Sequence, residues 1–365
     1  MSDDPSGEPA APGDPLHTRF CALVGVRHPI VQTGMGWVSG ARLTAATSEA
    51  GGLGILAAVT LTFDQMRDAV HDVKERTDRP FGVNFRPDQP DLAERLRFVV
   101  DAGVRVVSFA GAPSRDVVAR LHDAGALAMP TVGARRHAEK MLDFGVDAVI
   151  AQGGEGGGHT GTVPTSLLLP QVCDAVAAEI PVLGAGGFHD GRGLVAALAY
   201  GADGIAMGTR FLLTQESRVP DDIKRRYLDA TVFDTVVTTA LDGAPQRVIR
   251  TDLVDELERS SVVTRLPRAV LNALAFRKVT RTSVTDLVRE GLDMRKSQDL
   301  SWSQLALAAN APMLIKAALV DGDATIGVLP TGQVTGVIAE LPTVAELVAG
   351  LVAEAEATLA RLAPR

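Results

Sequence analysis

Short apolar runs alternate with longer amphipathic stretches along the chain up to about residue 212. The runs are rich in Val, Ile, Leu and Ala, and each is followed by a stretch whose apolar positions recur at helical spacing. This alternation is typical of parallel βαβ units. The runs expected to form strands are Pro29–Thr33, Leu53–Ala57, Phe81–Phe85, Arg105–Ala110, Leu127–Thr131, Ala148–Gln152, Pro181–Gly184 and Gly204–Met207. The stretches expected to form helices include Ala41–Ala50, Phe63–Arg76, Pro90–Ala102, Ser114–Ala124, Ala134–Phe144, Leu167–Glu179 and Gly191–Tyr200.

Several of the expected helices are followed directly by a glycine, and a glycine at that position commonly ends a helix. Eight strands with helices between them favour an α/β fold of the (β/α)8 TIM barrel type. The strand count alone leaves an open, doubly wound sheet as the alternative. The eighth barrel helix is expected to follow Thr209. The glycines that mark helix ends are Gly51, Gly103, Gly125, Gly145 and Gly201.

The pattern divides the chain into four parts. Residues 1–15 are rich in Pro, Gly, Asp and Ala and lack the apolar core of a signal peptide, so we expect a disordered tail. Residues 16–212 carry the barrel strands and helices. Residues 213–340 are expected to form a mostly helical cap region, and residues 341–365 a C-terminal helix that packs on the barrel.

Composition narrows the class of protein. The chain has 365 residues, of which 46% are hydrophobic and 22% charged, as in globular proteins with a sizeable core. A net charge of −8 argues against a nucleic-acid partner, because phosphate backbones are held by surplus Lys and Arg. We expect no transmembrane helix. Cys21 and Cys173 have no metal-binding spacing, so we expect no metal site, no disulfide framework and a reducing cytoplasm.

Glycine clusters follow the expected strands at the end where parallel barrels place their active sites. Backbone N–H groups can converge on phosphate oxygens only where no Cβ intervenes, and a following helix N-terminus adds positive partial charge. A single Gly-Gly pair is more simply a tight turn. Several such clusters together favour a phosphate or cofactor site. The residues on this edge are Gly34-Met35-Gly36, Asn84, Gln152 to Gly161, Gly184-Ala185-Gly186-Gly187 and Gly208-Thr209.

One imidazole stands at the end of the longest glycine cluster. His159 follows a loop bare enough for a flat ring to approach the backbone, and histidine exchanges protons near neutral pH. His189 is the rival on the same edge of the barrel. Glu155 is expected to bind ribityl hydroxyls or to orient the loop, and an exposed loop glutamate is the simpler alternative. Cys173 lies within an expected helix, so we do not expect a cysteine nucleophile.

These segments resemble the nitronate monooxygenase (2-nitropropane dioxygenase) family, which includes a flavin-dependent enoyl-acyl-carrier-protein reductase. The resemblance implies a barrel that binds FMN non-covalently and His159 as the catalytic acid or base. It implies FMN contacts at Asn84, Gln152, Gly157, Gly187, Ala206, Met207, Gly208 and Thr209, with Gly34 and Met35 beside the ring. The matching segments are residues 29–36, 50–54, 81–84, 152–161, 185–188 and 207–211.

Two features distinguish this chain from the nitronate-oxidising members of that family. Nitronate-oxidising members tend to carry Ala-Pro-Met-Ala-Gly after the first strand, where this chain has Thr33-Gly34-Met35-Gly36-Trp37, closer to the enoyl reductase. Residues 300–304 and 309–314 resemble an actinobacterial branch of flavin dehydrogenases that act on a CoA thioester in steroid C/D-ring breakdown.

Three functions follow as hypotheses. In the first, FMN exchanges a hydride with an acyl-CoA-type thioester while His159 handles the proton next to its carbonyl, and NAD(P)H is a candidate co-substrate. The segment 259–296, rich in basic residues, would bind CoA phosphates, although a solvated helical face is the commoner explanation. In the second, the protein is a nitronate monooxygenase that uses O2. In the third, it binds flavin or serves as a scaffold without turnover. A homo-oligomer is left open.

Overall fold

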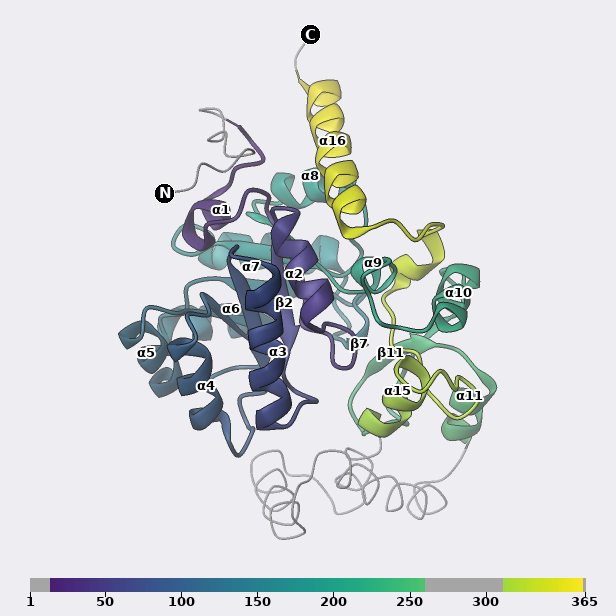
Figure 1. Ribbon diagram of the computed structural model, residues 1–365. Helices are drawn as coiled ribbons and strands as arrows, with labels where there is room; N and C mark the ends of the chain where they lie inside the picture. Colours follow the sequence, from purple (N-terminus) through teal and green to yellow (C-terminus); the bar gives the residue numbers. More distant parts are fainter. Residues whose placement is uncertain (1–13, 260–310, 364–365) are drawn as a thin grey trace.

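Eight parallel strands close into a barrel at the centre of the molecule (Figure 1). The computed structural model describes residues 14–259 and 311–363. The strands are hydrogen-bonded in chain order and the last pairs with the first, which confirms the closed (β/α)8 barrel over the open sheet. The barrel strands are β1 (Ile30–Gln32), β2 (Leu53–Ala57), β3 (Phe81–Phe85), β4 (Val106–Phe109), β5 (Leu127–Val132), β6 (Val149–Gln152), β8 (Val182–Ala185) and β9 (Gly204–Met207).

Alternate strand residues fill the barrel interior and the layer between strands and helices. Val31, Leu53 and Ile55 belong to the inner cluster, whereas Ile30 and Leu56 pack outward against the helices. The short helix α1 (Arg19–Val24) precedes the first strand, and its Phe20, Cys21 and Val24 join the inner cluster. Helix α1 therefore closes the end of the barrel opposite the strand termini that carry the glycine clusters.

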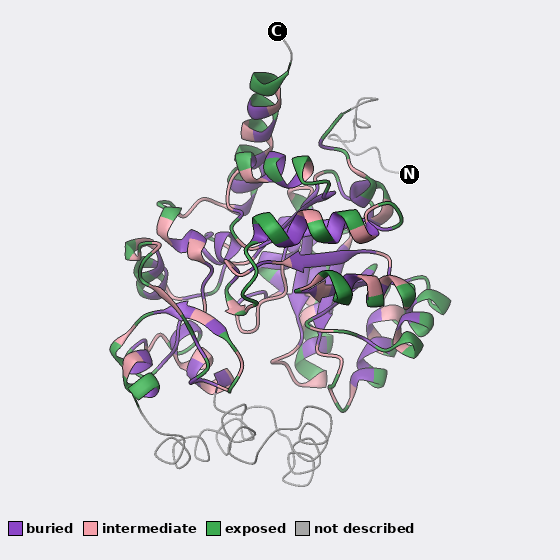
Figure 2. Ribbon diagram, turned by 180° about the vertical axis from the view of Figure 1, so that it is seen from behind, coloured by how far each residue is buried: buried purple, intermediate pink, exposed green. Residues whose placement is uncertain are grey.

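Seven helices surround the strands, close to the ranges expected from the sequence. Figure 2 shows the strands buried in the middle and exposed residues on the outer helix faces. Each of the five glycines expected at helix ends has a positive φ, between 72° and 91°. The helices are α2 (Ala41–Glu49), α3 (Phe63–Arg76), α4 (Leu92–Asp101), α5 (Arg115–Asp123), α6 (Arg135–Asp143), α7 (Thr165–Val176) and α8 (Gly191–Ala199).

The eighth barrel helix comes from the far end of the chain. The segment after Thr209 forms only the four-residue α9 (Thr209–Leu212), so the expectation of a full helix there was wrong. The long helix α16 (Val344–Leu362) instead packs against α8 and α2. Thr343 and Glu346 form a capping box at its start. A Cβ at Gly191 would clash with the backbone of α16, so the two helices meet closely there.

The region between α9 and α16 contains an antiparallel hairpin as well as helices. The β-branched run Thr235–Thr238 forms β10, and Gln246–Ile249 forms β11, which pairs in turn with the two-residue β7 (Gly158–His159). The sequence pattern pointed to a mostly helical region and missed these strands, because each is short and the pairing partner of β11 is distant in the chain. The other elements among the described residues of this region are α10 (Asp221–Asp229), α11 (Asp252–Arg259), α15 (Ala311–Leu319) and the 3-10 helix η1 (Gln333–Val337).

Some expectations from the sequence fall outside the described residues. These are most of the tail, residues 260–296 of the basic segment, and the resemblance at residues 300–304 and 309–310. Within the described residues, no helix is both long enough and apolar enough to span a membrane.

Candidate active site

Polar side chains lie at or near the ends of three barrel strands, β3, β4 and β6. Asn84 on β3 pairs in register with Ser108 on β4, and its Nδ2 donates to Ser108 Oγ at 2.9 Å. Gln152 ends β6, opposite Ala185 on β8. Asn84 and Gln152, both expected as cofactor contacts, thus lie on the same end of the barrel.

The loop after β1 is fixed by a serine that the sequence analysis missed. Ser39 Oγ donates to the carbonyl of Thr33 at 2.8 Å and accepts from the N–H of Met35 at 2.9 Å. Trp37 adopts a left-handed conformation, with φ of 67°, and its Nε1 donates to the carbonyl of Pro312 at 3.1 Å. Such a backbone is rare outside glycine. The hydrogen bond of the indole connects the loop after β1 to α15.

Close packing joins this loop to the ends of β3 and β9. A Cβ at Gly34 would overlap the side chain of Asn84, and a Cβ at Gly208 would lie 3.3 Å from Met35 Sδ. The N–H of Thr33 also donates to the carbonyl of Met207 at 3.1 Å. Ala206 and Met207 themselves are buried in β9. The structure therefore brings Gly34 and Met35, which were expected beside the flavin ring, close to Asn84 and Gly208, which were expected as further FMN contacts.

Glycines after β6, β8 and β9 form a cradle in which Gly157 and Gly186 have no room for a side chain. A Cβ at Gly157 would lie 2.5 Å from the Gly332 nitrogen, and one at Gly186 would lie 3.0 Å from the Gly156 nitrogen. The N–H of Gly332 donates to Thr209 Oγ1 at 2.9 Å, which draws the segment before η1 into the cradle. Backbone this closely approached from several loops suits a phosphate-bearing ligand.

Glu155 and Gly187 fix the middle of the cradle. Glu155 Oε2 accepts from the backbone N–H of Thr165 at 2.9 Å and from its hydroxyl at 2.7 Å, which holds the glycine loop to the start of α7. Gly187 has a φ of +84°, and a Cβ there would lie 3.8 Å from Glu155 Cβ. Of the roles weighed for Glu155, the structure shows the loop-orienting one.

An arginine from the hairpin also reaches the glycine loop. Arg247 Nη2 donates to the carbonyl of Gly154 at 2.9 Å, and Nη1 donates to Thr235 Oγ1 at 3.1 Å. Burial lowers the pKa of Arg247, and the charge of Glu155 works in the opposite direction. The contact with Gly154 fastens the hairpin to the barrel, and the contact with Thr235 lies within the hairpin.

His159 stands on β7, where the glycine loop meets the hairpin. It pairs in register with Gln246, and its Nε2 lies 2.8 Å from Asp242 Oδ2. The side chain of His159 is 66% exposed, whereas that of Asp242 is 10% exposed. Gln152 Nε2 donates to the backbone carbonyl of His159 at 2.7 Å. An accessible imidazole supported by a carboxylate can take up and release a proton.

The rival histidine and the cysteine have different surroundings. His189 is half-buried, its Nδ1 has no hydrogen-bond partner among the described residues, and its Nε2 lies 3.6 Å from Asp190 Oδ2. Burial lowers the pKa of His189 and disfavours its protonated form. Cys173 lies inside α7, and burial raises the pKa of its thiol to about 12. A thiol with that pKa is a poor nucleophile at neutral pH.

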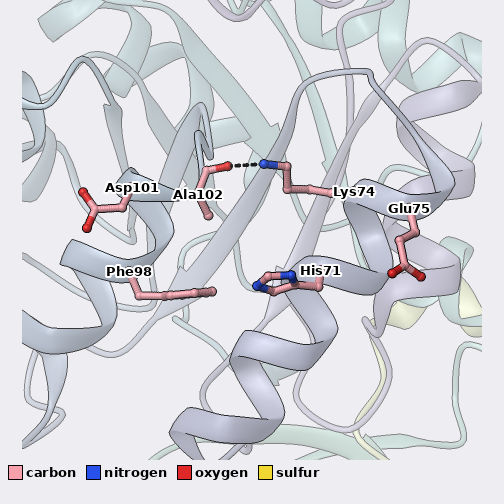
Figure 3. Close-up of a pocket in the computed structure, with 6 residues that line it drawn as sticks. All are labelled: His71, Lys74, Glu75, Phe98, Asp101 and Ala102. Carbon is pink, nitrogen blue, oxygen red and sulfur yellow. Dashed lines mark hydrogen bonds between the residues drawn. The ribbon is translucent and has the colours of Figure 1, made fainter.

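A separate hollow of about 370 Å³ lies between α3 and α4, in the helical layer (Figure 3). His71 stacks on Phe98 with 5.9 Å between ring centroids, and Lys74 Nζ donates to the carbonyl of Ala102 at 2.7 Å. These contacts join two neighbouring helices, and the strand ends contribute nothing to the hollow. We therefore assign it no part in the candidate site.

Several site residues could not be found from local sequence signals. Ser39, Thr165 and Gly332 act through hydrogen bonds or close approach to loops that are distant in the chain. Asp242 and Gln246 occupy a segment expected to be helical, so nothing placed them beside His159. In the described part of the chain, no group of three or more His, Cys, Asp or Glu side chains is arranged to hold a metal ion.

Comparison with known proteins identifies close relatives. The sequence model of the family described as nitronate monooxygenase matches residues 17–101 and 93–354. A protein of Mycobacterium tuberculosis named (3aS,4S,5R,7aS)-5-hydroxy-7a-methyl-1-oxo-octahydro-1H-indene-4-carboxyl-CoA dehydrogenase is 54% identical over 341 residues, which cover 93% of this chain and 96% of that protein.

Two solved structures share the whole architecture. FabK from Thermotoga maritima superposes with a TM-score of 0.75 at 32% identity, covering 94% of this chain and 98% of FabK. A nitroalkane oxidase from Streptomyces ansochromogenes superposes with a TM-score of 0.74 at 31% identity, covering 94% of this chain and all of the oxidase chain. Both similarities extend over the barrel and the C-terminal elements.

Proposed function

The chain belongs to the nitronate monooxygenase family of oxidoreductases, and from this premise we propose that it is an FMN-dependent dehydrogenase of an acyl-CoA thioester. One observation carries the proposal, namely the 54% identity to a carboxyl-CoA dehydrogenase over 93% of this chain. That relative's name describes an octahydroindene ring system with hydroxyl, methyl and keto groups. We propose a substrate of that class.

The glycine cradle supports FMN as the cofactor, since members of this family are flavin enzymes. Gly157, Gly187, Gly208 and Thr209 lie in the segments that directly follow barrel strands; Gly157 meets the backbone of Gly332, and Thr209 Oγ1 accepts from the N–H of Gly332. We assign them to the phosphate end of FMN, together with Ala206 and Met207. We assign Asn84, Gln152, Gly34 and Met35 to the ring. Metal chemistry forms no part of the proposal.

The chemistry divides between cofactor and protein. When bound, FMN supplies a centre that accepts a hydride with its two electrons, so the substrate's second hydrogen must leave as a proton. His159 accepts that proton from the carbon next to the thioester carbonyl, where the carbonyl makes it removable. NAD(P)+ is the proposed acceptor that takes the electrons onward, or NAD(P)H the donor in the reverse direction.

The region 213–340 is the proposed substrate-selecting cap. Its hairpin holds His159, and its helix α15 contacts the loop after β1 through Pro312 and Trp37. Both contacts lie at the end of the barrel where the strand termini and the glycine cradle are found. We propose that the chain acts without a nucleic-acid or membrane partner and in the cytoplasm.

Oxidation of alkyl nitronates is the second candidate, because the family model and the nitroalkane oxidase structure both favour it. The segment Thr33 to Trp37 departs from the pattern usual in nitronate-oxidising members. The CoA thioester is therefore the preferred substrate.

The deciding experiment is a visible spectrum of the purified protein under anaerobic conditions. The oxidised flavin bands should be bleached by an octahydroindene-carboxyl-CoA thioester, and they should be bleached by NADH or NADPH if a nicotinamide recycles the cofactor. Bleaching by an alkyl nitronate alone would establish the second candidate. A colourless protein that does not take up FMN would favour a role without turnover.

A further inference from the structure

We propose that Asp242 is the positioning residue for His159, and that it leaves Nδ1 of the imidazole as the atom that exchanges the substrate proton. The inference rests on the proposed acid/base function of His159. Its starting point is the 2.8 Å separation between His159 Nε2 and Asp242 Oδ2.

The hydrogen bonds around Asp242 determine which imidazole nitrogen carries the proton. Asp242 Oδ1 accepts from the N–H of Ala244 at 3.1 Å, and Oδ2 accepts from Nε2 of Gln246. An ionised carboxylate only accepts hydrogen bonds, so His159 must donate from Nε2. The hydrogen bond that one ring nitrogen makes sets the state of the other, which leaves the lone pair of the neutral ring on Nδ1.

Gln246 supports the same assignment. Gln246 Nε2 lies 3.3 Å from His159 Nε2, but two hydrogen-bond donors cannot satisfy each other. The side-chain amide of Gln246 instead donates to the carboxylate of Asp242. Gln246 is 1% exposed, so its amide is held in place by its surroundings. The carboxylate therefore receives hydrogen bonds from a buried amide and from an accessible imidazole.

Backbone pairing keeps Asp242 and His159 in register. His159 pairs with Gln246, Gly158 pairs with Arg247, and the N–H of Thr160 donates to the carbonyl of Pro245 at 3.1 Å. Asp242 lies in the turn just before this paired segment. The loop after β6 and the turn of the hairpin are thus held together, and the carboxylate stays beside the ring when the imidazole becomes protonated.

Asp242 therefore has two consequences for the reaction. It holds the ring in one tautomer with Nδ1 free to accept, and it stabilises the imidazolium that forms when His159 takes up a proton. Its carboxylate is bound to His159, Ala244 and Gln246, so we assign its effect to His159 and not to a direct contact with substrate or cofactor.

The test compares Asp242→Asn and Asp242→Glu with wild-type holoenzyme. The matched control is Asp123→Asn, at an exposed residue of the barrel helix α5. Ring-nitrogen NMR of ¹⁵N-histidine-labelled protein, with His159 assigned from His159→Gln, should show the Nε2–H tautomer in wild type and a shifted tautomer population in Asp242→Asn. The kcat of Asp242→Asn should fall by at least tenfold but by no more than the roughly 10²–10⁴-fold loss that removing the acid/base group itself causes. KM and FMN content should stay unchanged, and Asp242→Glu should recover part of the loss.

The NMR experiment needs no substrate, so it is independent of the proposed reaction. Loss of activity only in the His159 variant, with an Nδ1–H tautomer in wild type, would overturn the role of Asp242 and leave the proposed function standing. Full activity in the His159 variant would overturn the proposed function instead. If Asp242→Asn does not fold, the wild-type tautomer and the Asp242→Glu kinetics still decide the matter.

Discussion

The side chain of Gln152 holds the backbone of His159, with 2.7 Å between Nε2 of the glutamine and the carbonyl oxygen of the histidine. Gln152 ends β6, so this bond closes the glycine loop back onto the barrel. On its other side, His159 is held by the hairpin through Asp242. His159 is thus anchored from two parts of the chain, through its backbone and through its ring, while its imidazole stays accessible.

Replacing His159 with alanine tests the acid/base assignment. Because the variant has no group to exchange the substrate proton, flavin reduction by the thioester should slow by about 10²–10⁴-fold. FMN content should not change, since the cradle uses backbone atoms. The exposed His137, replaced by alanine in the same way, is the control. Stopped-flow spectra that show unaltered flavin reduction in His159→Ala would rule out this role.

Two alanine variants in the glycine loop test whether FMN binds at the cradle. In Gly157→Ala, the new Cβ would lie 2.5 Å from the backbone nitrogen of Gly332, and backbone cannot move aside easily. Such overpacking costs about 1–3 kcal/mol, so FMN should bind about tenfold more weakly or be lost. Gly161 lies in the same loop with nothing within 4 Å of an added Cβ, so Gly161→Ala should keep its flavin. Equal FMN affinity in both, measured by fluorescence titration, would argue against this placement of the cofactor.

Protonation of His189 should make stability depend on pH. Burial lowers its pKa below 6.5, so as pH falls through 6.5 the unfolded chain takes up a proton that the folded protein still excludes. The contribution of His189 to stability is complete above pH 6.5 and is lost as pH falls towards the folded-state pKa. Urea unfolding at about pH 7.5 and about pH 5.5 should therefore show a smaller loss for His189→Gln than for wild type. An identical loss in the two proteins would contradict the burial argument.

The packing of α16 on α8 can be tested with two glycine substitutions that should change the unfolding free energy in opposite directions. In Gly191→Ala, the added Cβ would clash with the backbone of α16, and the unfolding free energy should fall by about 1–3 kcal/mol. Gly350 lies on the exposed side of α16 with nothing within 4 Å, so Gly350→Ala should stabilise the protein by about 0.5–1 kcal/mol. Thermal unfolding midpoints that move in the same direction would show that α16 does not rest on Gly191 as described.

The barrel was predictable because its signals are local. Each strand is an apolar run such as Leu53–Ala57, and most helix ends are marked by a glycine such as Gly103. The spacing of apolar residues and these end signals are therefore enough to predict the barrel. The position of the glycine clusters followed from the barrel rule that active sites lie at the strand ends. His159 could be singled out by the same rule.

The parts that escaped prediction depend on contacts between distant segments. Helix α16 was expected as a C-terminal helix packed on the barrel, but nothing in its sequence placed it between α2 and α8. The run at Thr235 was β-branched, yet it lacked the alternation that would separate a strand from a buried helix. Asp242 became a site residue only through the pairing of β11 with β7. Local patterns carry no record of such pairings.

The position of α16 near the C-terminal end of the sequence has a consequence for how the protein folds. Contacts between α2 and α16 join residues near 45 with residues near 350, among the longest sequence separations in the described chain. Because loop closure must precede the gain from such contacts, we expect the wall between α8 and α2 to close late in folding. Before that step, the apolar flanks of both helices are uncovered. This seam is where kinetic traps and chaperone dependence should concentrate.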